Sequence, residues 1–221
     1  MIVAVRKPLP EIEASLAPYR TVALVGCRGC VTVCSVGGEK EVGVLAAELA
    51  LARRVKGAPF EARESTVERQ CDPEYVDPLG AALTGVDVVL SLACGAGVQF
   101  LGERLPRLRV LPAVNTVFIG VTESAGKWSE RCQACGDCKL GRTAGICPIA
   151  RCSKSLLNGP CGGSKGGSCE VDPAIPCGWA LIVQRLEERG ELERFEEFAE
   201  PNDWRTGRDG GPRRAVREEL T

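Results

Sequence analysis

The sequence predicts an α/β protein: a small parallel sheet with flanking helices, flavodoxin-like or Rossmann-like, followed by a loop-rich, cysteine-rich metal-binding module and C-terminal helices. Two observations predict this order. Compact apolar runs alternate with stretches of helical periodicity as far as residue 121. Eight cysteines then fall within residues 132–177, among many glycines and few large apolar side chains. We expect three segments, 1–126, 127–178 and 179–221.

The elements of the first segment follow from hydrophobic patterning. Short β-rich apolar runs predict strands at residues 21–25, 86–92, 110–114 and 118–121, and residues 60–67 are a further candidate strand. Helical spacing of apolar residues predicts helices at residues 8–19, 39–55, 73–83 and 98–105, the third of these short and broken by turns. Alternation of this kind implies parallel strands joined by right-handed crossovers, with helices on the faces of the sheet.

The remaining segments have weaker patterning. Residues 122–131 (TESAGKWSER) are expected to be a polar link into the cysteine-rich module. Residues 179–189 predict an amphipathic helix stopped by Gly190, and residues 191–198 a second short helix. The tail from Pro201 is charged and glycine-containing, which suits a solvated extension or an arm that reaches a partner subunit.

Composition narrows the function. The chain has 221 residues, no histidine and a net charge of −1, so nothing favours nucleic-acid binding and every histidine ligand or base is excluded. No apolar run is long enough for a membrane span or a signal segment, and we expect a cytoplasmic protein. In a reducing cytoplasm, the thirteen cysteines are better suited to binding metal than to forming disulfides.

The eight-cysteine segment carries the strongest signal. It reads C-x2-C-x2-C-x8-C-P-x2-R-C-x8-C-x7-C-x7-C, and its opening triplet has the spacing of bacterial ferredoxins. Eight thiolates make two four-ligand sites: a [4Fe–4S] cluster on the triplet and one more cysteine, and a second cluster or a structural zinc on the remaining four. Spacing leaves the pairing open. The predicted ligands are Cys132, Cys135, Cys138, Cys147, Cys152, Cys161, Cys169 and Cys177.

A second group of cysteines follows the predicted strands. Cys27, Cys30 and Cys34 come after the first strand and Cys94 after a later one, and ligands of parallel sheets sit at the carboxyl ends of strands. We predict that these four bind a cluster, with Cys71 as the alternative fourth ligand. A redox-active C-x2-C dithiol is the competing interpretation. A phosphate-binding loop is excluded because neither glycine-rich consensus is present.

These stretches resemble a known family. CQACGDCKLGRTAGICPIARCSKSLLNGPCGG, CEVDPAIPCGWALIVQRLEERGEL and PNDW are similar to the small cysteine-rich subunit of two-subunit methylenetetrahydrofolate reductases, as are GCRGCVTVCSVGGEKEV and LSLACGAGVQ. The resemblance implies an iron–sulfur protein that passes electrons to the flavin of a larger TIM-barrel subunit, which reduces 5,10-methylenetetrahydrofolate to 5-methyltetrahydrofolate. Descriptions of this family as zinc-ribbon-like imply zinc at one site.

The residues themselves agree with a non-catalytic role. No nucleophile–base pair and no paired carboxylates stand out, so the chain is not expected to perform folate chemistry alone. We expect two or three [4Fe–4S] clusters, one of them replaceable by zinc, a flavin-containing catalytic partner, and a ferredoxin or an NADH-oxidising subunit as the electron donor. The alternatives are a structural zinc subunit that assembles the complex without moving electrons, and a thiol–disulfide oxidoreductase.

Overall fold

The computed structural model describes residues 1–220 and divides into two compact units. Unit 1 comprises residues 1–118 and 124–126, and unit 2 comprises residues 119–123 and those from Lys127 onward. The predicted fold class is confirmed: a four-stranded parallel sheet with flanking helices precedes a loop-rich, cysteine-rich region and C-terminal helices. Among the described residues, no helix combines the length and the apolar character that a bilayer crossing requires.

The parallel sheet of unit 1 has the strand order β3-β2-β4-β5. Its strands are β2 (Thr21–Cys27), β3 (Glu61–Val67), β4 (Val88–Ser91) and β5 (Val110–Pro112). In register, Cys27 lies opposite Val67, and Val25 lies opposite Ser91. The chain adds β3 on one side of β2, and β4 and β5 on the other, so the order reverses between β2 and β4. This reversal is the topological switch point, where open α/β sheets bind ligands.

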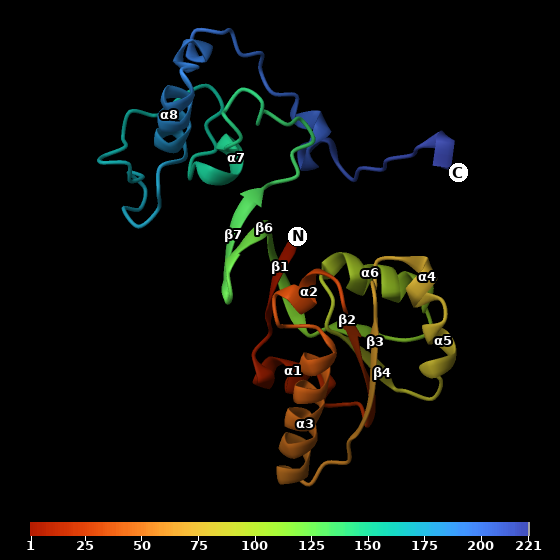
Figure 1. The fold of residues 1–221 in the computed structure, drawn as a ribbon. Coiled ribbons are helices and arrows are strands. Elements are labelled where there is room, and N and C mark those ends of the chain that lie inside the picture. The colour runs from red at the N-terminus through yellow and green to blue at the C-terminus, as the bar shows by residue number, and fades with distance from the viewer. Residues whose placement is uncertain (221) are drawn as a thin grey trace. The chain divides into compact units, whose positions relative to one another are not determined.

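Helices cover both faces of this sheet (Figure 1). Side chains alternate along β2, so that Val22 and Leu24 join one buried cluster while Ala23 and Val25 join the other. The first cluster packs against α1 and α3, and the second against α4, α5 and α6. The helices are α1 (Leu9–Leu16), α2 (Cys30–Val33), α3 (Glu39–Val55), α4 (Pro73–Val76), α5 (Leu79–Ala82) and α6 (Gly95–Arg104).

A second sheet has the strand order β1-β6-β7 and corrects the sequence analysis. It consists of β1 (Ile2–Arg6), β6 (Val114–Ser124) and β7 (Lys127–Cys132). The prediction of a polar link at 122–131 is wrong, because these residues form the end of β6, a turn at Gly126 with φ of 76°, and β7. The short strand expected at 118–121 is part of the longer β6, and β1 was not predicted at all.

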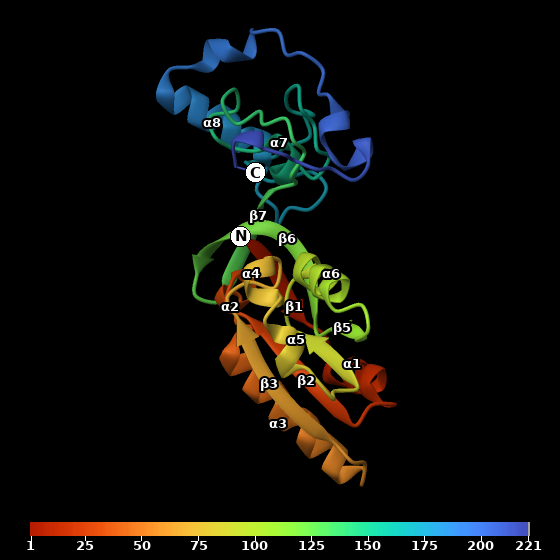
Figure 2. The ribbon, with the colours of Figure 1, turned by 90° about the vertical axis from the view of Figure 1, so that its right-hand side faces the viewer.

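Unit 2 is built around one amphipathic helix. Helix α8 (Gly178–Arg189) ends at Gly190, as predicted, with φ of 66° in the left-handed region that glycine tolerates. Its apolar stripe buries Trp179, Ile182 and Leu186 against Ala144 and Ile146. Of the second helix expected at 191–198, a single 3-10 turn forms, η1 (Leu192–Phe195). The remaining elements are α7 (Pro148–Arg151), η2 (Trp204–Thr206), η3 (Arg208–Gly210) and η4 (Glu218–Leu220) (Figure 2).

Candidate thiolate sites

Backbone N–H groups face three sulfurs of the eight-cysteine segment. The amide of Ala134 donates to Cys132 Sγ at 3.3 Å, that of Gly163 to Cys161 Sγ at 3.4 Å, and that of Ala150 to Cys147 Sγ at 3.5 Å. Each donor lies two or three residues after its cysteine, which is the geometry of a tight turn folded over a sulfur. Hydrogen bonds of this kind favour the anionic thiolate, the form that binds metal.

The last four cysteines of the segment share one neighbourhood. Ser153 Oγ, next to Cys152, lies 3.5 Å from Cys169 Sγ. Cys161 Sγ lies 3.3 Å from a carboxylate oxygen of Glu170, the residue after Cys169. The amide of Cys177 donates to the carbonyl of Gly167 at 2.8 Å, and that of Cys169 to the carbonyl of Ile175 at 2.9 Å. These contacts hold the loops of Cys152, Cys161, Cys169 and Cys177 against one another.

Several neighbouring groups lower the pKa of the Cys169 thiol. The hydrogen bond with Ser153 lowers the pKa of its thiol, and the backbone amides of Val171 and Asp172 and the charge of Lys154 add to the effect. Lys154 also pairs with Glu170, so that cation stays beside the sulfur. A thiol whose pKa is lowered by several donors on separate loops has the electrostatics of a metal ligand.

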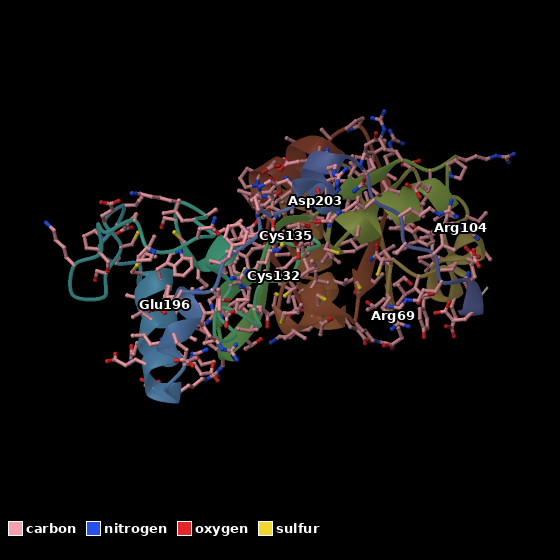
Figure 3. All side chains as sticks on the ribbon, turned by 90° about the horizontal axis from the view of Figure 1, so that it is seen from above. Arg69, Arg104, Cys132, Cys135, Glu196 and Asp203 are labelled. Atoms are coloured by element: carbon pink, nitrogen blue, oxygen red, sulfur yellow. The ribbon has the colours of Figure 1, made fainter. Side chains whose placement is uncertain are left out.

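The C-terminal tail packs on the turn that carries Cys132 and Cys135. Thr206 Oγ1 donates to the carbonyl of Cys135 at 2.9 Å, and Arg213 donates to the carbonyl of Ala134 at 2.6 Å and to that of Thr206 at 3.1 Å. A Cβ at Gly136 would lie 2.2 Å from the Thr206 carbonyl, so the tail packs directly on this turn. Figure 3 shows Asp203, at the start of η2, beside Cys135 and Cys132.

Three arginines share a hollow with Cys147. A hollow of about 260 Å³ is lined by Cys147 together with Arg131, Arg151 and Arg185. Burial lowers the pKa of Arg151, and the charges of Arg131 and Arg185 lower it further, whereas Glu123 opposes the change. Three guanidinium groups with a single carboxylate partner leave excess positive charge beside a cysteine, which favours an anion in this hollow.

In unit 1, thiols from three loops approach one another at the carboxyl ends of the strands. Cys27 ends β2, Cys71 follows β3, and Cys94 caps the N-terminus of α6. Partial burial raises the pKa of the Cys71 thiol, and the nearby thiols of Cys94 and Cys27 raise it further. The three loops that carry Cys27, Cys71 and Cys94 therefore lie near one another at this edge, as the positions of these cysteines after the strands predict.

Cys30 and Cys34 lie on the short helix α2, Cys30 as its first residue and Cys34 just past its end. Cys34 is 4% exposed, and its Sγ lies 3.6 Å from the carbonyl of Ile2 in β1. Among residues 1–220, no three cysteine, aspartate or glutamate side chains already stand in metal-binding geometry. The donor set nevertheless fits a soft metal, because the sulfurs gather on glycine-rich turns with N–H groups aimed at several of them.

Fold and side chains together define an α/β domain joined to a cysteine-rich module. Residues 111–205, which include all eight cysteines of that module, match the family described as "Methylene-tetrahydrofolate reductase C terminal". This match confirms the resemblance given by the cysteine pattern and relates the chain to an oxidoreductase, methylenetetrahydrofolate reductase. No curated protein and no solved structure matches the chain.

Sequence reasoning missed the residues that support the cysteines. Gln70 is fully buried, and its role is invisible in sequence because it lies in a polar stretch after β3. Ser153 and Thr206 also contact the cysteine loops, yet a serine or threonine in a loop carries no motif. The proximity of Ser153 to Cys152 was the one available signal.

Proposed function

We propose that this chain is the electron-transfer subunit of a methylenetetrahydrofolate reductase complex. It would deliver electrons to the flavin of a TIM-barrel catalytic subunit that reduces 5,10-methylenetetrahydrofolate to 5-methyltetrahydrofolate. The observation that carries this proposal is the family match over the module whose turns direct backbone N–H groups at cysteine sulfurs. When bound, iron–sulfur clusters supply single electrons, which a flavin can collect in pairs.

The contacts within unit 2 support a pairing of its eight cysteines into two sites. Cys132, Cys135, Cys138 and Cys147 would form the first, because the triplet turn leads out of β7 and α7, which follows Cys147, packs on β7. Cys152, Cys161, Cys169 and Cys177 would form the second, through the contacts of Ser153 and Glu170. We propose a [4Fe–4S] cluster at the first site and a second cluster or a zinc ion at the second.

The protein's own residues have three tasks in this scheme. Amides such as that of Ala134 stabilise thiolate charge, and the arginines around Cys147 offset more of it, which raises the potential of an anionic centre. The tail residues Thr206 and Arg213 hold the triplet turn through hydrogen bonds to the carbonyls of Cys135 and Ala134. None of these groups acts as an acid or base toward folate, so the reaction is assigned to the flavin-bearing partner.

Anaerobic purification tests the proposal. We expect a brown protein containing iron and acid-labile sulfide, whose absorbance bleaches with dithionite and recovers when the catalytic subunit and methylenetetrahydrofolate are added. The electron donor would be a ferredoxin or an NADH-oxidising subunit, and each can be tried as a replacement for dithionite. A colourless protein holding zinc alone, with undiminished activity of the complex, would leave only a structural assembly role.

Paired variants test the two-site assignment. Cys138→Ser should remove the metal of the first site while the second keeps its own, and Cys169→Ser should do the reverse. Metal and sulfide content per chain, with circular dichroism as a control for folding, measures both. Loss of all metal of unit 2 from either variant, in a chain that remains folded, would contradict the division into two independent sites.

A further inference from the structure

A buried amide fills the switch point of the sheet in unit 1. Gln70 is 0% exposed, and its Nε2 donates to the carbonyls of Val25 at 2.8 Å and Gly26 at 3.1 Å. Its Oε1 accepts from the hydroxyl of Ser91 at 2.7 Å, and Ser91 Oγ accepts from the amide of Ala93 at 3.2 Å. One side chain thereby joins the loop after β3 to the ends of β2 and β4.

These bonds fix the residues that come next in each loop. Gly26 precedes Cys27, Gln70 precedes Cys71, and Ala93 precedes Cys94. The backbone groups tied together by the Gln70 amide and the Ser91 hydroxyl therefore each lead directly into a cysteine. Because three cysteines extend from one hydrogen-bonded corner, the separation of their sulfurs is set by the corner rather than by flexible loops.

Close packing around Gln70 reinforces this corner. A Cβ at Gly97, in the first turn of α6, would lie 2.8 Å from Ala93 Cβ and 3.0 Å from Gln70 Cβ, so glycine is needed for the helix to approach. Helices α2, α4 and α6 all start at this end of the sheet (Figure 1). The loop after β3, which carries Gln70, thus packs directly against the first turn of α6, the helix that begins right after Cys94.

The sulfur of Cys27 faces the same region. Its Sγ lies 3.7 Å from the carbonyl of Glu68, in the loop that leads to Cys71, and 3.5 Å from the position a Cβ would take on Gly29. Gly29 precedes Cys30, which is partly exposed at the start of α2. Cys34 is buried like Cys27, but its Sγ contacts a different part of the chain, the carbonyl of Ile2 in β1 at 3.6 Å.

We infer that Cys71 is a metal ligand in unit 1 together with Cys27, Cys94 and Cys30, that Cys34 is not, and that Gln70 is the positioning residue for this set. The inference rests on the proposed function, in that it presupposes a thiolate-bound metal centre in unit 1. It assigns to one site both cysteines, Cys71 and Cys94, that the sequence presents as alternatives. Cys34 then serves as a small apolar residue that closes the packing between α2 and β1.

Iron content of anaerobically purified full-length chain tests the ligand set. Cys71→Ala should lose the iron and sulfide of one cluster per chain and the matching electron paramagnetic resonance signal, whereas Cys34→Ala should retain both. The opposite pattern, with Cys34→Ala depleted and Cys71→Ala intact, would overturn the inference. Thermal unfolding of each variant, followed by circular dichroism, verifies that the sheet is still folded.

A substitution at Gln70 tests the positioning role. Gln70→Met keeps the length and volume of the side chain but removes its hydrogen bonds, and it should change the resonance of this cluster and speed its loss to a chelator several-fold. Gln184→Met, on the exposed surface of α8 in unit 2, is the matched control and should behave like the parent protein. If Gln70→Met is indistinguishable from that control in both readouts, the positioning role is refuted.

A metal probe separates this inference from the proposed function. If the parent chain contains no iron, the electron-transfer proposal fails, and Co²⁺ added to the metal-free chain then reports on the ligands. The ligand set would still be supported if Cys71→Ala loses the thiolate-to-cobalt charge-transfer absorbance of one bound Co²⁺ per chain and Cys34→Ala does not. Absorption unaffected by Cys71→Ala would overturn it.

Discussion

The tail of unit 2 offers a sharp test of how the triplet turn is held. Thr206→Val removes one hydroxyl and preserves the branched shape of the side chain. That hydroxyl donates to the carbonyl of Cys135 at 2.9 Å or to that of Asp203 at 2.8 Å. Since a hydroxyl has one proton, the substitution removes the equivalent of one hydrogen bond, shared between the turn and the tail itself.

The size of the effect follows from that single bond. A neutral hydrogen bond in a partly buried position contributes about 0.5–1.5 kcal/mol net. A change of about 1 kcal/mol corresponds to roughly a fivefold change in an equilibrium constant at 25 °C. The fraction of molecules in which the tail has detached from residues 132–138 should therefore rise about fivefold, while the folded core around Ile182 is unchanged.

Two measurements follow this detachment. Amide hydrogen exchange of residues 132–138 should accelerate about fivefold, and so should iron release to an excess of chelator from the anaerobic protein, provided that release occurs from the detached state. Thr84→Val, the same change at an exposed position of unit 1, is the control and should alter neither rate. Unchanged exchange at residues 132–138 in Thr206→Val would refute the reasoning, because the tail would then contribute nothing to holding the turn.

Three further predictions concern the core, pH and charge. Ile182→Ala, at a fully buried position, should destabilise unit 2 by about 2–5 kcal/mol in chemical denaturation, while Leu192→Ala, at a position 46% exposed, should cost far less. The pKa of Asp87 is lowered by two backbone N–H groups at the start of β2, so its stabilising effect is present above about pH 4 and lost as pH falls through the lowered value. The difference in unfolding free energy between the parent chain and Asp87→Asn should therefore shrink in acid, and a difference independent of pH would exclude this cause. Arg185→Gln should lower the midpoint potential of the centre that we propose Cys147 binds, measured in an anaerobic redox titration, and an equal effect of Arg189→Gln, outside the arginine-lined hollow, would show that net charge alone is responsible.

The parallel sheet was predictable mainly because β2 and β4 are short, continuous apolar runs, whereas β3 is an edge strand with several polar residues. Strand β2 is buried on both faces along nearly all of its length, so its sequence TVALV is a continuous apolar run, as expected for a strand inside a parallel sheet. Strands β6 and β7 were missed where they carry Thr, Glu, Ser and Lys, because an exposed strand bears polar side chains and resembles a loop in sequence. Strand β1 is only five residues long and sits next to the chain start, where little pattern can accumulate.

The candidate sites were also predictable only in part: the cysteines could be identified from sequence, and the residues that support them could not. The cysteines could be singled out because cysteine is a rare residue and its short spacings predict tight turns, which the structure has at Cys132, Cys147 and Cys161. The residues that position them could not, since Gln70 and Thr206 act through backbone carbonyls that lie 45 and 71 residues away in sequence. Long-range hydrogen bonds to backbone leave no spacing pattern, so a single sequence contains no signal for them.

The side chain of Gln70 has a consequence for what unit 1 accepts. In dinucleotide-binding sheets of similar topology, a cofactor enters the crevice between the two strands where the order reverses. Here that entrance is plugged by the protein itself, and an adenine nucleotide could enter only by breaking the amide away from Val25, Gly26 and Ser91. The crevice that such sheets offer to a nucleotide is therefore occupied in this protein by a hydrogen-bonded side chain, and the loops around it carry Cys27, Cys71 and Cys94.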